Sequence, residues 1–422
     1  MRKRKKVFIS VMLVMVGIAL CYIGYFAVQH IYYSRFKSEK PDNTIVLAAS
    51  DRVESTSLLS DEDFLSTSGT EIVNRSGETV VLTGINLGGW LLQEYWMCPV
   101  KGDSDIEKWT YLETLQVLEK RFGQERTREL IASYEENWIT EVDFQNIADM
   151  GYNVVRIPFW YRNFMSDDEG TWIEEDFDRN PGFQRLDWAL EMAGKYGLYV
   201  ILDMHGCPGG QSTDHCAGSA RECKLFKDEN DQDIMEELWL AISTRYRDNP
   251  VVAAYDIMNE PEAQSYSGDD VMDDPRNQIY DRMIKAIRAN GDEHIITVEA
   301  IWTISVLPYP EDTDWDHVVY QVHSYGNSVD TYCEKMKNYS VEHQIPVYIG
   351  EFSDQSFFEM TKGLGISCTS WTYKGRKAAT GTWFVYDSDA LKAVNVNHDP
   401  YWLIRLKWGA CLNTKYFERA LF

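Results

Sequence analysis

The chain has 422 residues, of which 44% are hydrophobic, 25% charged and 13% aromatic, a composition that excludes disordered, collagen-like and coiled-coil proteins. With 41 Lys and Arg against 66 Asp and Glu, the formal net charge is −25, so the phosphate backbone of a nucleic acid is an unsuitable partner. The 14 Trp and 25 Tyr residues offer flat faces on which sugars stack, although large cores use them too.

The first 29 residues have the pattern of a membrane anchor. Residues 2–6 read RKRKK, and no charged residue occurs from Val7 to Val28. About 20 apolar residues span a bilayer as a helix, and flanking Lys and Arg favour an inside position for that flank. We therefore expect a cytoplasmic basic tip at 1–6, a transmembrane signal anchor at 7–29, and a catalytic part outside the cell membrane. A cleaved signal peptide, giving a secreted protein, is the alternative, although its apolar region is normally shorter and ends in a small-x-small site.

Residues 30–70 are rich in Ser, Asp and Glu with only short apolar interruptions, which is typical of a flexible stalk. The composition does not change again from 71 to 422, so we expect one domain there. About 350 residues is a suitable length for one elaborated (β/α)8 barrel. We expect this domain to act as a monomer.

Eight short runs rich in β-branched and aromatic residues alternate with helical patterns in this domain. Strands buried on both faces have this composition. The runs are 80–87, 152–159, 198–205, 252–260, 294–300, 318–325, 346–352 and 365–371. Amphipathic patterns at 184–196 and 231–247 are typical of the helices between them. Alternating strands and helices predict parallel βα units, and eight strands are the number that closes a TIM barrel.

Polar and aromatic side chains gather at or near the carboxyl ends of the predicted strands. They are Arg156, His205, Asn259, Glu260, His323, Tyr325, Glu351 and Trp371. One buried Arg or His is more often a satisfied core group than a catalyst, but this many at one end of a barrel are hard to explain in that way. The carboxyl ends of the strands form the face on which TIM barrels build active sites.

Two carboxyl groups stand out among these residues. Glu260 ends the fourth strand in the sequence Asn-Glu-Pro, and Glu351 lies near the end of the seventh in IGEF. Two carboxyl groups meeting at a barrel mouth suit glycosidic-bond hydrolysis, because one protonates the leaving oxygen while the other attacks the anomeric carbon. Their separation decides between retention and inversion, and the sequence does not supply it.

The ordered motifs GINLGGWLLQEYW, GYNVVRIPF, DMHG, MNEP, HSY, IGEF and TSW resemble those of glycoside hydrolase family 5. The resemblance implies a retaining enzyme with Glu260 as acid/base and Glu351 as nucleophile. It further implies that Asn259 binds the sugar 2-hydroxyl, that Arg156 and Tyr325 hold Glu351 in its ionised form, and that His205, His323 and Trp371 line the sugar subsite. It implies no cofactor and no metal.

Within that family, GINLGGWLLQEYW and the following PGGQ loop look most similar to the exo-β-1,3-glucanase branch. This similarity implies that Glu94 binds the sugar at the non-reducing end of a β-glucan and closes the pocket. An endo-β-1,4-glucanase is the alternative, and β-1,6-glucan and β-mannosidic substrates remain open. A glucan-binding protein without activity is a third possibility, but the presence of both carboxyl groups and Arg156 argues against it. Hydrolysis and transglycosylation are not separable by sequence.

The loop after the third strand differs from that branch because it contains Cys207, Cys216 and Cys223. With His205 and His215 nearby, these residues could suggest a metal centre, but neither the CxxC nor the HxxxH spacing of zinc sites occurs. We expect a disulfide bond within this loop instead, with a connectivity that the sequence does not reveal. The other cysteines, for which pairing is equally open, are Cys98, Cys333, Cys368 and Cys411 outside the anchor and Cys21 within it.

Overall fold

The computed structural model describes residues 57–94, 96–97, 100–101, 110–219, 222–262, 270–301, 303–354 and 356–375, and three two-residue strands beyond them. The predicted basic tip, the membrane anchor at 7–29 and the stalk up to residue 56 lie outside the described residues. Among the helices within these ranges, none has both the length and the apolar character needed to cross a membrane.

Eight parallel strands form a closed barrel in the order β10-β11-β3-β5-β6-β7-β8-β9. They are β3 (Thr83–Asn86), β5 (Val154–Trp160), β6 (Tyr199–Gly206), β7 (Val252–Asp256), β8 (Ile295–Glu299), β9 (Val318–Ser324), β10 (Val347–Phe352) and β11 (Ser367–Ser370). Each strand falls within or overlaps one of the eight predicted runs. The predicted TIM barrel is therefore confirmed.

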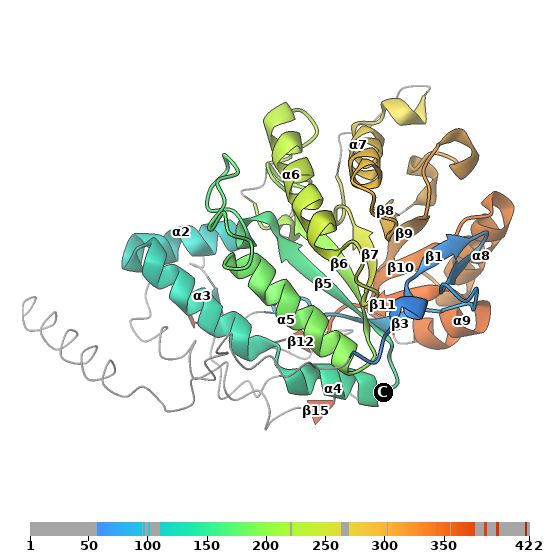
Figure 1. The fold of residues 1–422 in the computed structure, drawn as a ribbon, viewed down its shortest axis with the longest axis horizontal. Helices are drawn as coiled ribbons and strands as arrows, with labels where there is room; N and C mark the ends of the chain where they lie inside the picture. Colours follow the sequence, from blue (N-terminus) through green and yellow to red (C-terminus); the bar gives the residue numbers. More distant parts are fainter. Residues whose placement is uncertain are drawn as a thin grey trace, which may run out of the picture. The chain divides into compact units, whose positions relative to one another are not determined.

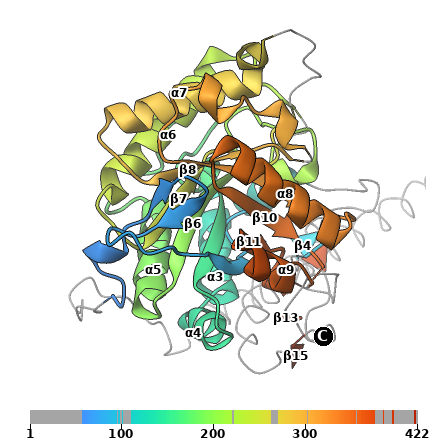
Figure 2. The same ribbon diagram turned by 90° about the vertical axis from the view of Figure 1, so that its right-hand side faces the viewer.

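The helices pack outside the strands, as Figure 1 shows for α5, α6 and α7 and Figure 2 for α8 and α9 beside β10 and β11. They are α2 (Tyr111–Phe122), α3 (Gln124–Trp138), α4 (Glu141–Asp149), α5 (Pro181–Lys195), α6 (Glu229–Tyr246), α7 (Pro275–Ala289), α8 (Val329–His343) and α9 (Ser356–Leu364). Helix α5 begins where Asn180 accepts a hydrogen bond from Gly182 N–H, with Pro181 at the first helical position, a favoured start for a helix. Both predicted helices, at 184–196 and 231–247, are present as α5 and α6.

A hairpin of β1 (Ser66–Ser68) and β2 (Glu71–Val73) precedes the barrel. Leu65 is fully buried, and it packs with Ile72, Val154 and Ile295 in a cluster at the amino-terminal ends of the strands. The predicted stalk therefore extends too far, because part of 57–70 is folded against the barrel. The local apolar residues Phe64 and Leu65 account for this difference, since their burial outweighs the polar composition around them.

Short two-residue strands complete the inventory: β4 (Val100–Lys101) pairs with β14 (Val394–Asn395), and β12 (Lys374–Gly375) with β13 (Phe384–Val385), which pairs with β15 (Glu418–Arg419). Lys374 is fully buried and forms an ion pair of 2.9 Å with Asp143 of α4.

Candidate active site

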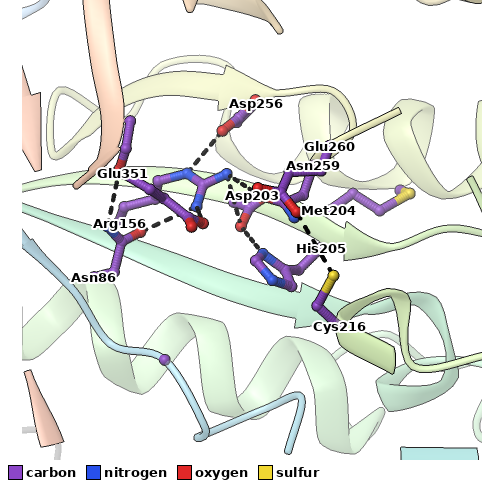
Figure 3. Close-up of polar contacts among 12 residues, drawn as sticks. Asn86, Arg156, Asp203, Met204, His205, Cys216, Asp256, Asn259, Glu260 and Glu351 are labelled. Atoms are coloured by element: carbon purple, nitrogen blue, oxygen red, sulfur yellow. Dashed lines mark hydrogen bonds and ion pairs between the residues drawn. The ribbon is translucent and has the colours of Figure 1, made fainter. Parts of the chain in front are cut away.

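Arg156 of β5 is the centre of a buried polar network inside the barrel (Figure 3). Its guanidinium group contacts Asp256 (2.8 Å), Asn259 (2.9 Å), Glu351 (3.0 Å), Asn86 (3.0 Å) and Asp203 (3.1 Å). A buried cation is costly unless it is paired and hydrogen-bonded, and here every nitrogen of the guanidinium group has an acceptor. Arg156 is therefore a fixed positive charge that positions side chains from several strands.

Three of these partners were missing from the sequence prediction. Asn86 ends β3, Asp203 lies within β6 and Asp256 ends β7. All three are fully buried. A signal was present, because a charged residue within a hydrophobic strand requires a partner of opposite charge, and Asp203 is two residues from His205 on the same face of the strand.

Glu351 of β10 is held by the two residues expected to hold it. Arg156 Nη1 donates to its Oε1, and the Tyr325 hydroxyl donates to its Oε2 at 2.7 Å. Burial raises the pKa of Glu351, while the positive charge of Arg156 opposes this rise. The expected contacts are therefore present, but they do not bring the pKa below its ordinary value, because the carboxyl group is almost completely removed from solvent.

Glu260 follows β7 and faces Glu351. Its Oε1 lies 2.9 Å from His323 Nδ1, and the Cys216 thiol donates to its Oε2 at 3.7 Å. One oxygen of Glu260, one of Glu351 and a ring nitrogen of His323 all lie within 4.8 Å of one another. Burial raises the pKa of Glu260, Glu94 adds to the rise, and His205 and Cys216 oppose it. A raised pKa is what a general acid requires near neutral pH.

The imidazole of His323 between the two carboxyl groups is uncharged, because burial lowers its pKa to about 4. Together with Glu260 and Glu351 it forms a group of ligand atoms close enough to hold a metal ion. Nothing in the arrangement requires one, since Arg156 and Tyr325 already satisfy Glu351.

His205 and Trp371 form one wall of the site. Their rings stack 5.3 Å apart with an interplanar angle of 9°, and His205 Nδ1 lies 2.7 Å from Asp203. Gly88 lies directly against the indole, since a Cβ atom there would come within 2.8 Å of the Trp371 ring. The orientation of the Trp371 ring is therefore set by His205 and by a residue that must lack a side chain.

Glu94, on the loop after β3, is buried near Glu260. The Trp96 indole donates to its Oε2 at 2.8 Å, and His215 Nε2 lies 3.0 Å from the same oxygen. On its other side, His215 Nδ1 lies 2.6 Å from Asp214. The segment 214–216 therefore brings His215 to Glu94 and Cys216 to Glu260. Neither His215 nor Cys216 was among the predicted site residues.

All nine predicted site residues thus lie in one connected site. Asn259 is fixed by Arg156, which donates to its Oδ1, and by Gln211, which donates to its main-chain oxygen at 2.8 Å. Trp371, Tyr325 and Trp96 belong to one small apolar cluster with Met97, which places Glu94 and its Trp96 partner beside Glu351 and its Tyr325 partner.

The expectation of a disulfide bond in the cysteine loop is wrong, because Cys207, Cys216 and Cys223 are free thiols. Each points to a different acceptor: Cys207 to Met204 O (3.8 Å), Cys216 to Glu260 and Cys223 to Glu262 O (3.2 Å). Cys333 and Cys368 are also free and buried. Cys21, Cys98 and Cys411 lie outside the described residues.

The chain is similar to several known proteins. The curated relatives include a β-xylosidase of Phanerodontia chrysosporium, 29% identical over 269 residues (62% of this chain and 52% of the relative). They also include a glucan 1,3-β-glucosidase of Pichia angusta, 26% identical over 247 residues (57% and 53%). The matched region thus spans about half the length of these curated relatives. Among solved structures, an endogalactoceramidase superposes with a TM-score of 0.55 at 18% identity (79% of this chain and 78% of the other), which supports the fold.

The family description "Cellulase (glycosyl hydrolase family 5)" matches residues 120–377. This region is more than half of the chain, and it contains β5 to β11 and both Glu260 and Glu351. The chain belongs to glycosyl hydrolase family 5.

Proposed function

We propose that this protein is a retaining β-glycosidase that releases single sugars from the non-reducing end of a β-1,3-glucan. The observation that carries the mechanism is the approach of Glu260 and Glu351 oxygens to within 4.8 Å. Retaining enzymes place their carboxyl groups about 5–5.5 Å apart, whereas inverting enzymes separate them by about 6.5–9.5 Å to admit a water molecule. The short approach favours direct attack by a carboxylate.

In the first step Glu351 attacks the anomeric carbon while Glu260 transfers its proton to the leaving glycosidic oxygen. The bond to the leaving sugar breaks and an ester to Glu351 forms. In the second step Glu260, now a carboxylate, takes a proton from a water molecule that displaces the ester and regenerates Glu351. The pKa of each carboxyl group is raised by burial, and the charge on Glu260 adds to the rise at Glu351. Formation of the neutral ester therefore makes it easier for Glu260 to lose its proton.

The proposal of exo action rests on Glu94. This carboxyl group is buried, is held by Trp96 and His215, and is near enough to Glu260 to raise the pKa of the acid/base. A fixed acceptor so close to the acid/base suits a sugar hydroxyl at the closed end of a pocket. An endo-acting enzyme needs an open groove on both sides of the acid/base.

Two alternatives have their own support. The family description is that of cellulases, which keeps an endo-β-1,4-glucanase open. The β-xylosidase relative makes a β-xyloside the second candidate for the terminal sugar, because xylose differs from glucose only in lacking the exocyclic hydroxymethyl group.

Product analysis decides among these functions. We expect laminarin to give glucose alone, with the β-anomer formed first by proton NMR, and little release from cellotetraose or xylobiose. A ladder of oligomers would contradict exo action, and an α-anomer formed first would contradict retention. We expect Glu260→Ala or Glu351→Ala to lower turnover by several orders of magnitude. Near-normal activity in either variant would show that the substituted residue does not have its proposed catalytic role.

We also propose that residues 7–29 anchor the enzyme in the cell membrane with its barrel outside. This rests on the charge-free run of Val7 to Val28 after RKRKK. Intact mass of the protein extracted from cells tests it, since loss of about 30 residues would show that the segment is a cleaved signal peptide.

A further inference from the structure

A third carboxyl group, that of Glu299, lies beneath the two catalytic ones. Glu299 is the last residue of β8 and its side chain is completely buried. The Tyr280 hydroxyl of α7 accepts from the Glu299 N–H at 2.9 Å and donates to its main-chain oxygen at 3.0 Å. The backbone that carries this carboxyl group is therefore locked in place from the helix layer.

The main-chain contact of this carboxyl group is with the acid/base. Glu299 Oε2 accepts a hydrogen bond from the N–H of Glu260 at 2.7 Å. Glu260 has a φ angle of +43°, in the left-handed region, which is strained for a residue with a side chain. The hydrogen bond that this N–H donates to Glu299 opposes the strain and holds the main chain in this conformation.

The same carboxyl group also acts on the side chain of Glu260 through His323, whose Nδ1 lies 3.3 Å from Glu299 Oε1. Gln321 Nε2 lies 3.4 Å from Glu299 Oε2 and 3.3 Å from His323 Nε2. When Gln321 donates to Nε2 of the uncharged imidazole, the ring proton of His323 is on Nδ1, which points to Glu260 Oε1 at 2.9 Å. The acidic proton of Glu260 must then be on Oε2, the oxygen that faces Cys216.

We propose that Glu299 is a positioning residue for the acid/base, holding the main chain of Glu260 directly and its carboxyl group through Gln321 and His323. The inference rests on the proposed role of Glu260. Without Glu299, the peptide at Glu260 can leave the left-handed region, and the carboxyl group of Glu260 loses the orientation that His323 gives it. The nucleophile is held by Arg156 at 3.0 Å and by Tyr325 at 2.7 Å, neither of which passes through Glu299, and its approach to His323 Nδ1 is longer, at 3.5 Å.

This separation of supports defines the kinetic test. With a dinitrophenyl β-glycoside, whose leaving group needs no proton, the first chemical step depends on Glu351 alone. With a disaccharide it depends on Glu260 as well. We expect Glu299→Ala to lower kcat on the disaccharide 10- to 100-fold with KM changed less than threefold. The rate of the dinitrophenolate burst should fall less than threefold.

Glu299→Gln is the conservative variant, because its amide oxygen can still accept from Glu260 N–H. It should recover at least a third of wild-type kcat on the disaccharide and keep the basic limb of the pH profile within half a pH unit. In Glu299→Ala that limb should shift by a full unit or more. Asp292→Ala is the matched control. Asp292 precedes the same strand, and its buried carboxyl group accepts a hydrogen bond from the Tyr255 hydroxyl. We expect Asp292→Ala to lower the thermal midpoint and leave the ratio of the two activities unchanged.

Equal losses on both substrates, or wild-type kcat in Glu299→Ala, would overturn the proposal. If the wild-type enzyme cleaves no β-glycoside, the proposed function fails, and the crystal structure of Glu299→Ala tests the positioning by itself. A Glu260 φ angle that stays near +43° with an unchanged contact to His323 would overturn the inference. Movement of Glu260 out of the left-handed region would support it.

Discussion

The Tyr325 hydroxyl donates a hydrogen bond of 2.7 Å to Glu351 Oε2, and Tyr325→Phe removes this bond with little change in shape. A hydrogen bond to a charged group contributes about 1.5–3 kcal/mol, and one pKa unit corresponds to about 1.36 kcal/mol. Because the bond stabilises the ionised form of Glu351, its removal should raise the pKa of the nucleophile by about 1–2 units.

The acidic limb of kcat/KM reports ionisation of the essential base in the free enzyme, and the nucleophile must be ionised to attack. We therefore expect the acidic limb of Tyr325→Phe to move to higher pH by about 1–2 units. At pH values below that limb, kcat/KM of Tyr325→Phe should be about 10- to 100-fold lower than that of the wild type at the same pH. The assay is kcat/KM on an aryl β-glycoside from pH 3 to 9, with the fold checked by circular dichroism.

Tyr320→Phe provides the matched control. Tyr320 lies on β9, five residues before Tyr325, and its buried hydroxyl donates to Pro308 O at 2.8 Å, outside the active site. Its loss should cost about 0.5–1.5 kcal/mol of stability and leave the pH profile unchanged. An acidic limb that stays in place in Tyr325→Phe, or that moves equally in both variants, would refute the reasoning.

Further predictions concern groups near Glu260 and one buried carboxyl group elsewhere. Burial raises the pKa of Glu260 and the Cys216 hydrogen bond opposes the rise, so Cys216→Ala should move the basic limb of kcat/KM to higher pH and Cys216→Ser should not. Glu94 raises the same pKa, so Glu94→Gln should move this limb to lower pH. Burial raises the pKa of Glu135 to about 7, so ionisation of this group lowers the free energy of unfolding progressively as the pH rises above about 4.5. In urea unfolding, the free energy of unfolding of Glu135→Gln should exceed that of the wild type by on the order of 2 kcal/mol at pH 8 and should match it at pH 4.

Much of the fold follows from the sequence, because strands buried on both faces appear as continuous apolar runs. Polar residues interrupt these runs mainly near the carboxyl ends of the strands, where the site lies. Arg156, Glu260 and Glu351 were placed correctly for this reason. Asp203 and Asp256 were accessible to the same reasoning, since a buried Arg156 needs anionic neighbours. In the predicted runs 198–205 and 252–260 they lie in the interior, whereas most of the predicted site residues lie at or near the ends of their runs.

The loop residues could not be placed in this way. The contact of His215 with Glu94 depends on the path of the whole loop after β6, and no local periodicity specifies such a path. The same limit explains the free thiols of Cys216 and Cys223, because spacing along a loop does not determine whether two sulfur atoms meet. The hairpin before the barrel shows a related limit, since the burial of Phe64 and Leu65 outweighs the polar composition of the residues around them.

The charge balance of the site links these observations. Five carboxyl groups are gathered around one permanent cation, Arg156, and they are Asp203, Asp256, Glu260, Glu299 and Glu351. Buried like charges at this density cannot all remain ionised. Burial raises the pKa of Glu299 as well as Glu260, so the surplus of carboxyl groups itself keeps a proton in the site. In the proposed mechanism one negative charge disappears when Glu351 becomes an ester, so Glu260 can release its proton and act as the base. On this proposal, the excess of acid at the barrel mouth is what allows one carboxyl group to serve in both halves of the reaction.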